Sequence, residues 1–157
     1  WPAAPVRGVP TEPLRVVHML LIHDLVEIDA GDTFCYDVDA HLDKEARERA
    51  AAERLFGLLP LEQARAWHAL WQEFEAGETA EARFANALDR LQPLLLNRQS
   101  GGGSWRTHEV REAQVQARLA PVRDALPAAW PLVQETIEEG VRLGLLRKET
   151  DVPEYSP

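Results

Sequence analysis

The sequence predicts an all-α protein, a bundle of about five to six helices in one domain. Apolar residues recur at helical spacing through most of the 157 residues, and helix-capping residues or helix breakers separate the apolar runs. No stretch alternates polar and apolar residues over the length of a strand, as a half-buried strand would. A chain of this length buries roughly 68–70% of its unfolded surface, so it can form a core without disulfides.

The first expected helix covers residues 14–28, an apolar run that a helix can bury on most of its circumference. Thr11 is expected to cap this helix, with Pro13 in its first turn, where a missing N–H group is tolerated. Gly31 is expected to end it. Residues 1–10 contain three prolines and a glycine, and they predict an irregular segment before the helix.

Five further helices are expected from apolar spacing and from residues typical of helix ends. Pro60 and Gly77 separate neighbouring helices, and Thr79 is a capping residue. Pro93 is expected to bend the helix that follows Thr79, and Pro121 is expected to interrupt a later one. The expected ranges are 44–59, 61–75, 80–97, 111–125 and 128–143.

The segments between these helices are polar or rich in glycine. An acidic loop is expected at residues 37–43, and the glycine- and serine-rich residues 99–104 predict a flexible loop. The domain is expected to span residues 1–147, and residues 148–157 form a polar tail.

Composition and charge exclude several classes of function. The net charge is −9, from 17 basic and 26 acidic residues, which argues against a nucleic acid polymer or an anionic membrane as partner. No apolar run reaches the ~18 residues of a membrane span. The single cysteine, Cys35, excludes a disulfide or a thiolate zinc site within one chain and suits a reducing, cytoplasmic setting.

Two polar residues, His23 and Asp24, interrupt the apolar run of the first helix. An unpaired polar group costs several kcal/mol to bury, and a charge costs more, so the pair needs partners. Glu27 lies four residues after His23, about 40° round the helix, and therefore shares its face. Asp32 lies just past the expected helix end and could fold back towards the same region.

Asp89 is a second isolated carboxylate, flanked by apolar residues in the middle of an expected helix. Aspartate has a low helix propensity, so Asp89 is either paired with Arg90 or is a metal ligand. One imidazole and two carboxylates suit Mn²⁺, Co²⁺, Fe²⁺, Zn²⁺ or Mg²⁺ better than Cu(I). The candidate cofactor is therefore a divalent metal ion.

This arrangement resembles the HD-domain phosphohydrolases, and in particular their 5′-deoxynucleotidase-like branch. The His-Asp pair is followed by Glu27 and the Gly31-Asp32-Thr33 turn. The resemblance runs from about Leu14 to Leu145. Three later stretches contribute to it, namely Ala-Ala-Glu-Arg-Leu-Phe at 51–56, Leu-Trp-Gln-Glu-Phe-Glu at 70–75 and Ala-Leu-Asp-Arg-Leu-Gln-Pro at 87–93.

The resemblance implies a fold, a reaction and a set of site residues. It implies a divalent metal held by His23, Asp24 and Asp89, which would polarise a phosphate. Glu27 would protonate the leaving ribose oxygen, and Asp32 would orient or deprotonate the attacking water. The implied substrate is a small-molecule nucleotide, and the implied reaction removes the 5′-phosphate of a deoxynucleoside monophosphate.

The family's first metal-binding histidine has no counterpart in this sequence. Family members carry it on a helix before the His-Asp helix, together with an arginine that grips the nucleotide nearby. The only histidine before His23 is His18, about 140° away round the helix, so it should face elsewhere. We expect the chain, which begins at Trp1 without an initiator Met, to lack that helix. The uncovered apolar face of residues 14–28 then favours a homodimer.

Two other functions and several structural roles stay open. The chain could be a truncated or degenerate HD-domain protein that only binds a partner, or a phosphohydrolase for another nucleotide phosphate. His23 and Asp24 could form a core pair, and Glu27 and Asp32 could be a surface and a turn residue. Trp105 and His108 could border the pocket, although packing is the favoured role of both, and no further cofactor-binding residues are expected.

Overall fold

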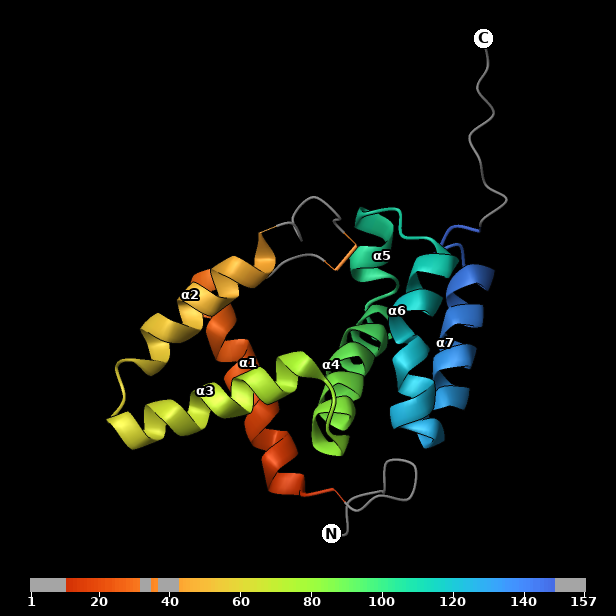
Figure 1. The fold of residues 1–157 in the computed structure, drawn as a ribbon. Coiled ribbons are helices and arrows are strands. Elements are labelled where there is room, and N and C mark those ends of the chain that lie inside the picture. Colours follow the sequence, from red (N-terminus) through yellow and green to blue (C-terminus); the bar gives the residue numbers. More distant parts are fainter. Residues whose placement is uncertain (1–10, 32–34, 37–42, 149–157) are drawn as a thin grey trace. The chain divides into compact units, whose positions relative to one another are not determined.

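The computed structural model describes residues 11–31, 35–36 and 43–148. Within these ranges the chain forms seven α-helices and one 3₁₀ turn, and no strand (Figure 1). One isolated parallel bridge joins Arg111 to Arg147. The prediction of an all-α protein is confirmed, with one more α-helix than expected. No helix in the described part of the chain is long and apolar enough to span a membrane.

The chain divides into two compact units, residues 1–86 and 87–157. The described part of the first unit contains α1 (Pro13–Ala30), α2 (Lys44–Phe56), α3 (Leu61–Ala76) and the first two turns of α4 (Ala80–Gln99). The second contains the rest of α4, followed by α5 (Gly103–Thr107), α6 (Glu112–Ala125), the 3₁₀ turn Pro127–Ala129 and α7 (Trp130–Arg142).

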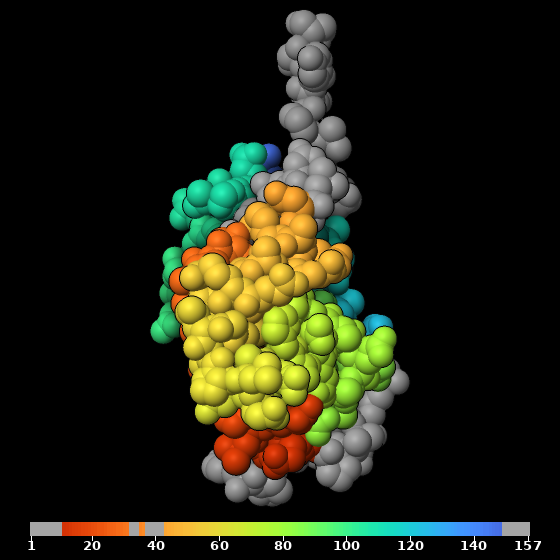
Figure 2. All heavy atoms as spheres, turned by 60° about the vertical axis from the view of Figure 1, so that its left-hand side comes forward, coloured from red at the N-terminus to blue at the C-terminus, as the bar shows by residue number. Residues whose placement is uncertain are grey.

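The core of the first unit lies where α1, α2 and α3 contact one another. Buried residues recur every three or four positions along α1, as expected for one face of a helix. They pack against apolar residues of α2 and α3, whose outer surfaces lie side by side in Figure 2 (orange to yellow). The cluster comprises Ile22, Val26, Ala30, Ala51, Ala52, Phe56 and Trp71. Burial of each large apolar side chain contributes roughly 1.5–3 kcal/mol.

The two ends of α1 differ in how well the sequence predicted them. Gly31 ends the helix as expected, with a φ of 80° that favours glycine and an N–H that donates to the Glu27 carbonyl at 2.8 Å. The predicted cap at Thr11 is wrong, because α1 begins at Pro13 and Glu12 occupies the N-cap position. The N–H of Glu12 donates to Glu81 Oε1 at 3.1 Å.

The boundaries of the next helices follow the predictions within a few residues. The helix α2 ends at Phe56, short of the expected residue 59, and Gly77 ends α3 in the left-handed conformation with a φ of 62°. The predicted cap at Thr79 is confirmed, because its Oγ1 accepts the N–H of Ala82 at 3.1 Å. Pro93 lies inside α4, which continues to Gln99.

The second unit contains a core between α6 and α7, built from residues such as Leu119, Val122 and Val133. The predicted loop at residues 99–104 is shorter than expected, because α5 begins at Gly103. The indole of Trp105 is buried at 3% exposure, which supports the packing role. The expected interruption of the later helix is wrong, since α6 continues through Pro121.

A candidate metal centre on helix α1

The imidazole of His23 occupies the middle of α1 and is only 8% exposed. Its ring packs against the ring of Phe74 on α3, with centroids 4.3 Å apart and planes tilted by 30°. The periodicity of α1 brings His23 to the buried face together with Ile22 and Val26. The packed ring therefore has restricted freedom to turn, and it presents its two nitrogens in defined directions.

Both ring nitrogens of His23 lie near carboxylates. The Nε2 atom is 3.8 Å from Oε1 of Glu27, one turn later on α1. The Nδ1 atom is 3.5 Å from Oε1 of Glu75, near the end of α3. The imidazole therefore lies between two acidic side chains from different helices. A histidine whose only role is packing in the core does not need two such carboxylates.

Asp24 follows His23 but is exposed, whereas Glu27 is half-buried. The two residues of the His-Asp pair therefore do not form a buried core pair. A ring nitrogen of His23 and a carboxylate oxygen of Asp24 lie within 4.8 Å of each other, a separation that small side-chain rotations can reduce to that of two ligands of one ion. Glu27 shares this face of α1, as its spacing predicted.

Asp89 lies on α4 in the second unit and is half-buried. Its neighbour Arg90 donates from Nη1 to the backbone carbonyl of Arg118 at 3.2 Å. Burial lowers the pKa of the Arg90 guanidinium, the charge of Arg118 acts in the same direction, and the charge of Asp89 opposes both.

The C-terminal end of α1 is fixed by two arginines of α2. Arg47 donates to the carbonyl of Ala30, the last residue of α1, and Arg54 forms an ion pair with Asp29. The hydrogen bond from Arg54 is the main cause of the lowered pKa of the Asp29 carboxyl. The predicted catalytic residue Asp32 lies outside the described residues.

The N-terminal half of α1 is fixed by a second ion pair, between Arg15 and Glu73 on α3. The Thr79 hydroxyl also donates to Glu73, at 2.7 Å. The hydrogen bond from Arg15 is the main cause of the lowered pKa of the Glu73 carboxyl, and Thr79 adds to the effect. Tied near both ends, α1 is a rigid support for His23 and for the carboxylates beside it.

Sequence reasoning did not single out Glu75, although its carboxylate lies beside the ring of His23. The contact joins two helices far apart in the chain, so no helical spacing could show it. The one available signal was an acidic residue in the last turn of an expected helix, where the helix dipole disfavours negative charge.

The donors on α1 fit a divalent cation. A neutral imidazole is a borderline ligand and a carboxylate is a hard one, a combination that suits Zn²⁺, Fe²⁺, Co²⁺ or Mn²⁺. Three acidic side chains surround His23 within the first unit, namely Asp24, Glu27 and Glu75. Positive charge bound here would offset their mutual repulsion, because a bound cation is often the largest charge of its site.

Comparison with known proteins identifies relatives over much of the chain. The family model described as HD domain matches residues 4–130. The 5′-deoxynucleotidase HDDC2 of Xenopus laevis is 37% identical over 81 residues, 52% of this chain and 40% of that protein. The human protein of the same name is 33% identical over 81 residues, again covering 40% of its length. The chain thus spans less than half the length of these curated relatives.

A solved structure is similar over a larger share of the chain. It is the crystal structure of a protein from Magnetospirillum magnetotacticum MS-1, described as a predicted metal-dependent phosphohydrolase. The two sequences are 53% identical, and the TM-score is 0.81. The similarity covers 87% of this chain and 68% of that one.

Proposed function

The chain belongs to the HD domain family, and on that premise we propose that it is a metal-dependent phosphohydrolase acting on the 5′-phosphate of deoxynucleoside monophosphates. The similar bacterial structure is described as a metal-dependent phosphohydrolase, and the curated relatives are 5′-deoxynucleotidases. The observation that carries the proposal is the surroundings of His23, a nearly buried imidazole with Asp24 and Glu27 beside it on α1.

We propose that His23 and Asp24 hold the metal together with Asp89. Asp89 lies on α4 and is half-buried. Ala85 is fully buried, and the amide of Asn86 donates to the Phe74 carbonyl at 2.8 Å. Asp89 lies four residues after Ala85 and three after Asn86, which places it on the same face of the helix, one turn further on.

The support for Asp89 as a ligand comes from the sequence, because Asp89 lies in the stretch Ala-Leu-Asp-Arg-Leu-Gln-Pro at 87–93 that resembles the HD-domain family. Aspartate also has a low helix propensity, so the place of Asp89 in the middle of α4 favours a functional role.

The two remaining acidic residues divide the proton transfers between them. A bound divalent metal supplies positive charge that stabilises the phosphate oxygens in the transition state. Glu27 acts as general acid and protonates the ribose oxygen as the ester bond breaks. Asp32, two residues after the end of α1, acts as general base and takes a proton from the attacking water. Both roles are proposals, and that of Asp32 depends on the sequence alone.

A substrate panel tests this proposal. The metal-loaded chain is incubated with deoxynucleoside 5′-monophosphates, ribonucleoside 5′-monophosphates, nucleoside 3′-monophosphates and nucleoside triphosphates, and released phosphate is measured with and without EDTA. We expect EDTA-sensitive phosphate release that is fastest from the deoxynucleoside 5′-monophosphates.

The other outcomes of the panel point to the other functions. Faster release from another ester would contradict the substrate and favour a phosphohydrolase for a different nucleotide phosphate. Binding of nucleotide or metal without any release would favour a binding module that performs no chemistry.

We also propose that the chain works in a reducing, cytoplasmic setting, because Cys35 is its single cysteine.

We further propose that the chain forms a homodimer through α1. This helix exposes a row of large apolar side chains, namely Leu14, Val17, Leu21, Leu25 and Ile28. The row is symmetric about Leu21, because the other four residues lie four or seven positions before and after it. Two copies of α1 packed antiparallel would therefore place like apolar residues opposite each other across a two-fold axis.

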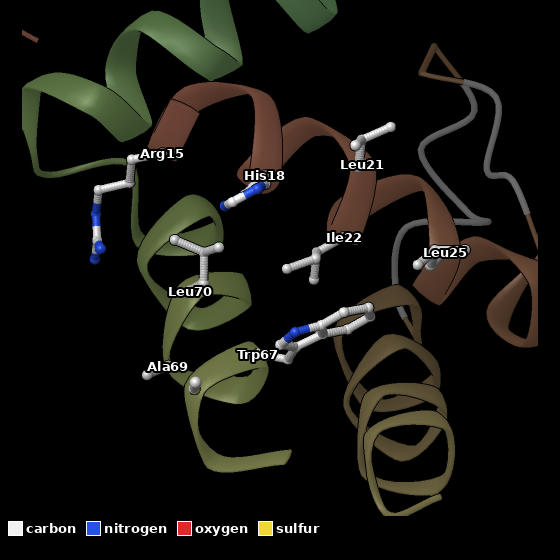
Figure 3. Close-up of a pocket in the computed structure, with 9 residues that line it drawn as sticks. Arg15, His18, Leu21, Ile22, Leu25, Trp67, Ala69 and Leu70 are labelled. Atoms are coloured by element: carbon white, nitrogen blue, oxygen red, sulfur yellow. The ribbon is translucent and has the colours of Figure 1, made fainter. Parts of the chain in front are cut away.

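A groove of about 690 Å³ borders the row between α1 and α3. Figure 3 shows its lining, in which Ile22 of α1 is directed towards Trp67 and Leu70 of α3.

A further inference from the structure

The carboxylate of Glu75 lies against the edge of His23 opposite to Glu27. Its Oε1 atom is 3.5 Å from Nδ1, whereas Glu27 approaches Nε2 at 3.8 Å. The Glu75 side chain is 35% exposed and the His23 side chain 10% exposed, so the pair is partly shielded from water. The separation from Nδ1 is slightly longer than a hydrogen bond, and a small rotation of the glutamate would close it.

The position of Glu75 is unfavourable for a carboxylate unless it serves another group. Glu75 is the penultimate residue of α3, whose last turn carries no basic residue. Unpaired carbonyls at a helix C-terminus repel a negative charge. The nearby Glu73 does not share this position, because Arg15 and Thr79 hold it. The interaction of Glu75 with His23 offsets this cost.

A histidine that binds a metal through one nitrogen carries a proton on the other. A carboxylate that accepts this proton fixes the tautomer and the orientation of the ring, and makes the ligating nitrogen more basic. In this chain an acceptor at Nδ1 leaves Nε2 as the ligating atom, on the side of Glu27.

We propose that Glu75 is a positioning residue that holds His23 as its Nδ1–H tautomer, with Nε2 directed to the metal. The proposal rests on the proposed function, because it assigns a role in the metal site inferred there. It extends that function by a residue from α3, a helix that contributes no ligand. The ring of Phe74 restrains the plane of the imidazole, and Glu75 selects which nitrogen carries the proton within that plane.

The tautomer of His23 in the metal-free chain tests the proposal directly. Long-range ¹H–¹⁵N correlation spectra, recorded well above the pH at which histidine is protonated, distinguish the two tautomers. We expect the Nδ1–H form in the unaltered chain and a mixture of both in Glu75→Ala. A matched control is Glu62→Ala on the same helix, whose side chain is 87% exposed and which should leave the spectrum of His23 unchanged.

The affinity for Co²⁺, measured by titration calorimetry, is the second readout. Glu75→Ala should weaken binding about 10- to 100-fold, whereas Glu75→Gln, whose amide oxygen still accepts a hydrogen bond, should lie closer to the unaltered chain. Unchanged affinity in Glu75→Ala, or a dominant Nε2–H tautomer in the unaltered chain, would overturn the proposal.

The two readouts also separate this proposal from the proposed function. An unaltered chain that does not bind Co²⁺ contradicts the metal site, and with it the role of Glu75 towards a metal. An unaltered chain that binds Co²⁺, but with the same affinity as Glu75→Ala, contradicts only the positioning role and leaves the metal site in place.

Discussion

At the scale of single residues, the chemistry is concentrated around one imidazole. His23 is nearly buried, yet Glu27 and Glu75 lie beside its two nitrogens and Asp24 follows it on α1. Without a cation, the carboxylates of this cluster repel one another, and burial strengthens their repulsion. The same cluster becomes favourable when positive charge binds to it.

Replacing Glu27 tests the acid in the proposed reaction. The Glu27→Gln variant keeps the shape of the side chain but cannot give up a proton. We expect kcat for a deoxynucleoside monophosphate at saturating metal to fall about 10²- to 10⁴-fold, while Co²⁺ affinity falls by a smaller factor, because one of several negative charges near the ion is lost. Steady-state kinetics and titration calorimetry measure the two quantities.

Glu62→Gln provides the control for this change, because Glu62 lies exposed on α3 and forms only a local pair with Arg65. Its kcat should match that of the unaltered chain. A Glu27→Gln variant with undiminished kcat would show that the proton comes from another group.

The sequence predicted the residues that share one helix better than those that meet across helices. His23, Asp24 and Glu27 could be placed on one face because a helix repeats every 3.6 residues. Glu75 escaped prediction because its neighbour in space is distant in the chain. Asp89 was proposed from its isolated place in mid-helix, where aspartate is unfavourable, and from the stretch at 87–93 that resembles the family.

At the scale of elements, α1 is held as a fixed support by charged side chains near both ends. Arg15 pairs with Glu73 of α3, and Asp29 pairs with Arg54 of α2. The same helices also pack through apolar side chains, and the ion pairs fix the direction in which α1 lies against α2 and α3. The position of His23 relative to α3 therefore depends on the ion pair near the start of α1.

Stability should depend on pH through Glu73. Its pKa is lowered in the folded chain, mainly by the hydrogen bond from Arg15, so the ion pair stabilises the fold above the unfolded pKa of about 4.3. That stabilisation is lost as the pH falls through the folded pKa. Glu73→Gln should therefore lower the free energy of unfolding by about 0.5–1 kcal/mol at neutral pH, a value reduced because Arg15 is 47% exposed.

Urea unfolding at a series of pH values measures this effect. The difference between the Glu73→Gln variant and the unaltered chain should shrink as the pH falls below about 4. A difference that stays constant from neutral to acidic pH would mean that packing, and not charge, sets the contribution of Glu73.

Helix ends could be predicted where a local rule decides them. Gly31 and Gly77 end their helices with positive φ, and Thr79 caps α4 through its own hydroxyl. The two wrong predictions involve contacts from elsewhere in the chain. Glu81 binds the N–H of Glu12, and Arg90 of α4 donates to the carbonyl of Arg118 in α6, the helix that continues through Pro121.

At the scale of the whole molecule, the exposed row on α1 determines the predicted assembly. A second copy would cover Leu21 and its symmetric neighbours, which are 38–70% exposed. Leu21→Glu would place two like charges at the two-fold axis, so we expect this variant to be monomeric at concentrations where the unaltered chain is a dimer. Light scattering coupled to size exclusion measures both masses.

Glu45→Ala, a change of an exposed residue on α2, should leave the mass unchanged and serves as the control. An unaltered chain that is monomeric at every concentration would contradict the homodimer. Equal dimerisation by Leu21→Glu would instead place the interface away from α1.

The central claim is that His23, Asp24 and Asp89 hold one divalent metal, and its most direct test is metal content. The unaltered chain and Asp89→Ala are each loaded with Mn²⁺ or Co²⁺ and dialysed, and metal per chain is measured by mass spectrometry, with circular dichroism to confirm folding. We expect about one ion per unaltered chain and its loss in a folded Asp89→Ala variant, since removing a ligand removes much of the binding free energy. Equal metal content in the two proteins would contradict the assignment of Asp89 and the site built on it.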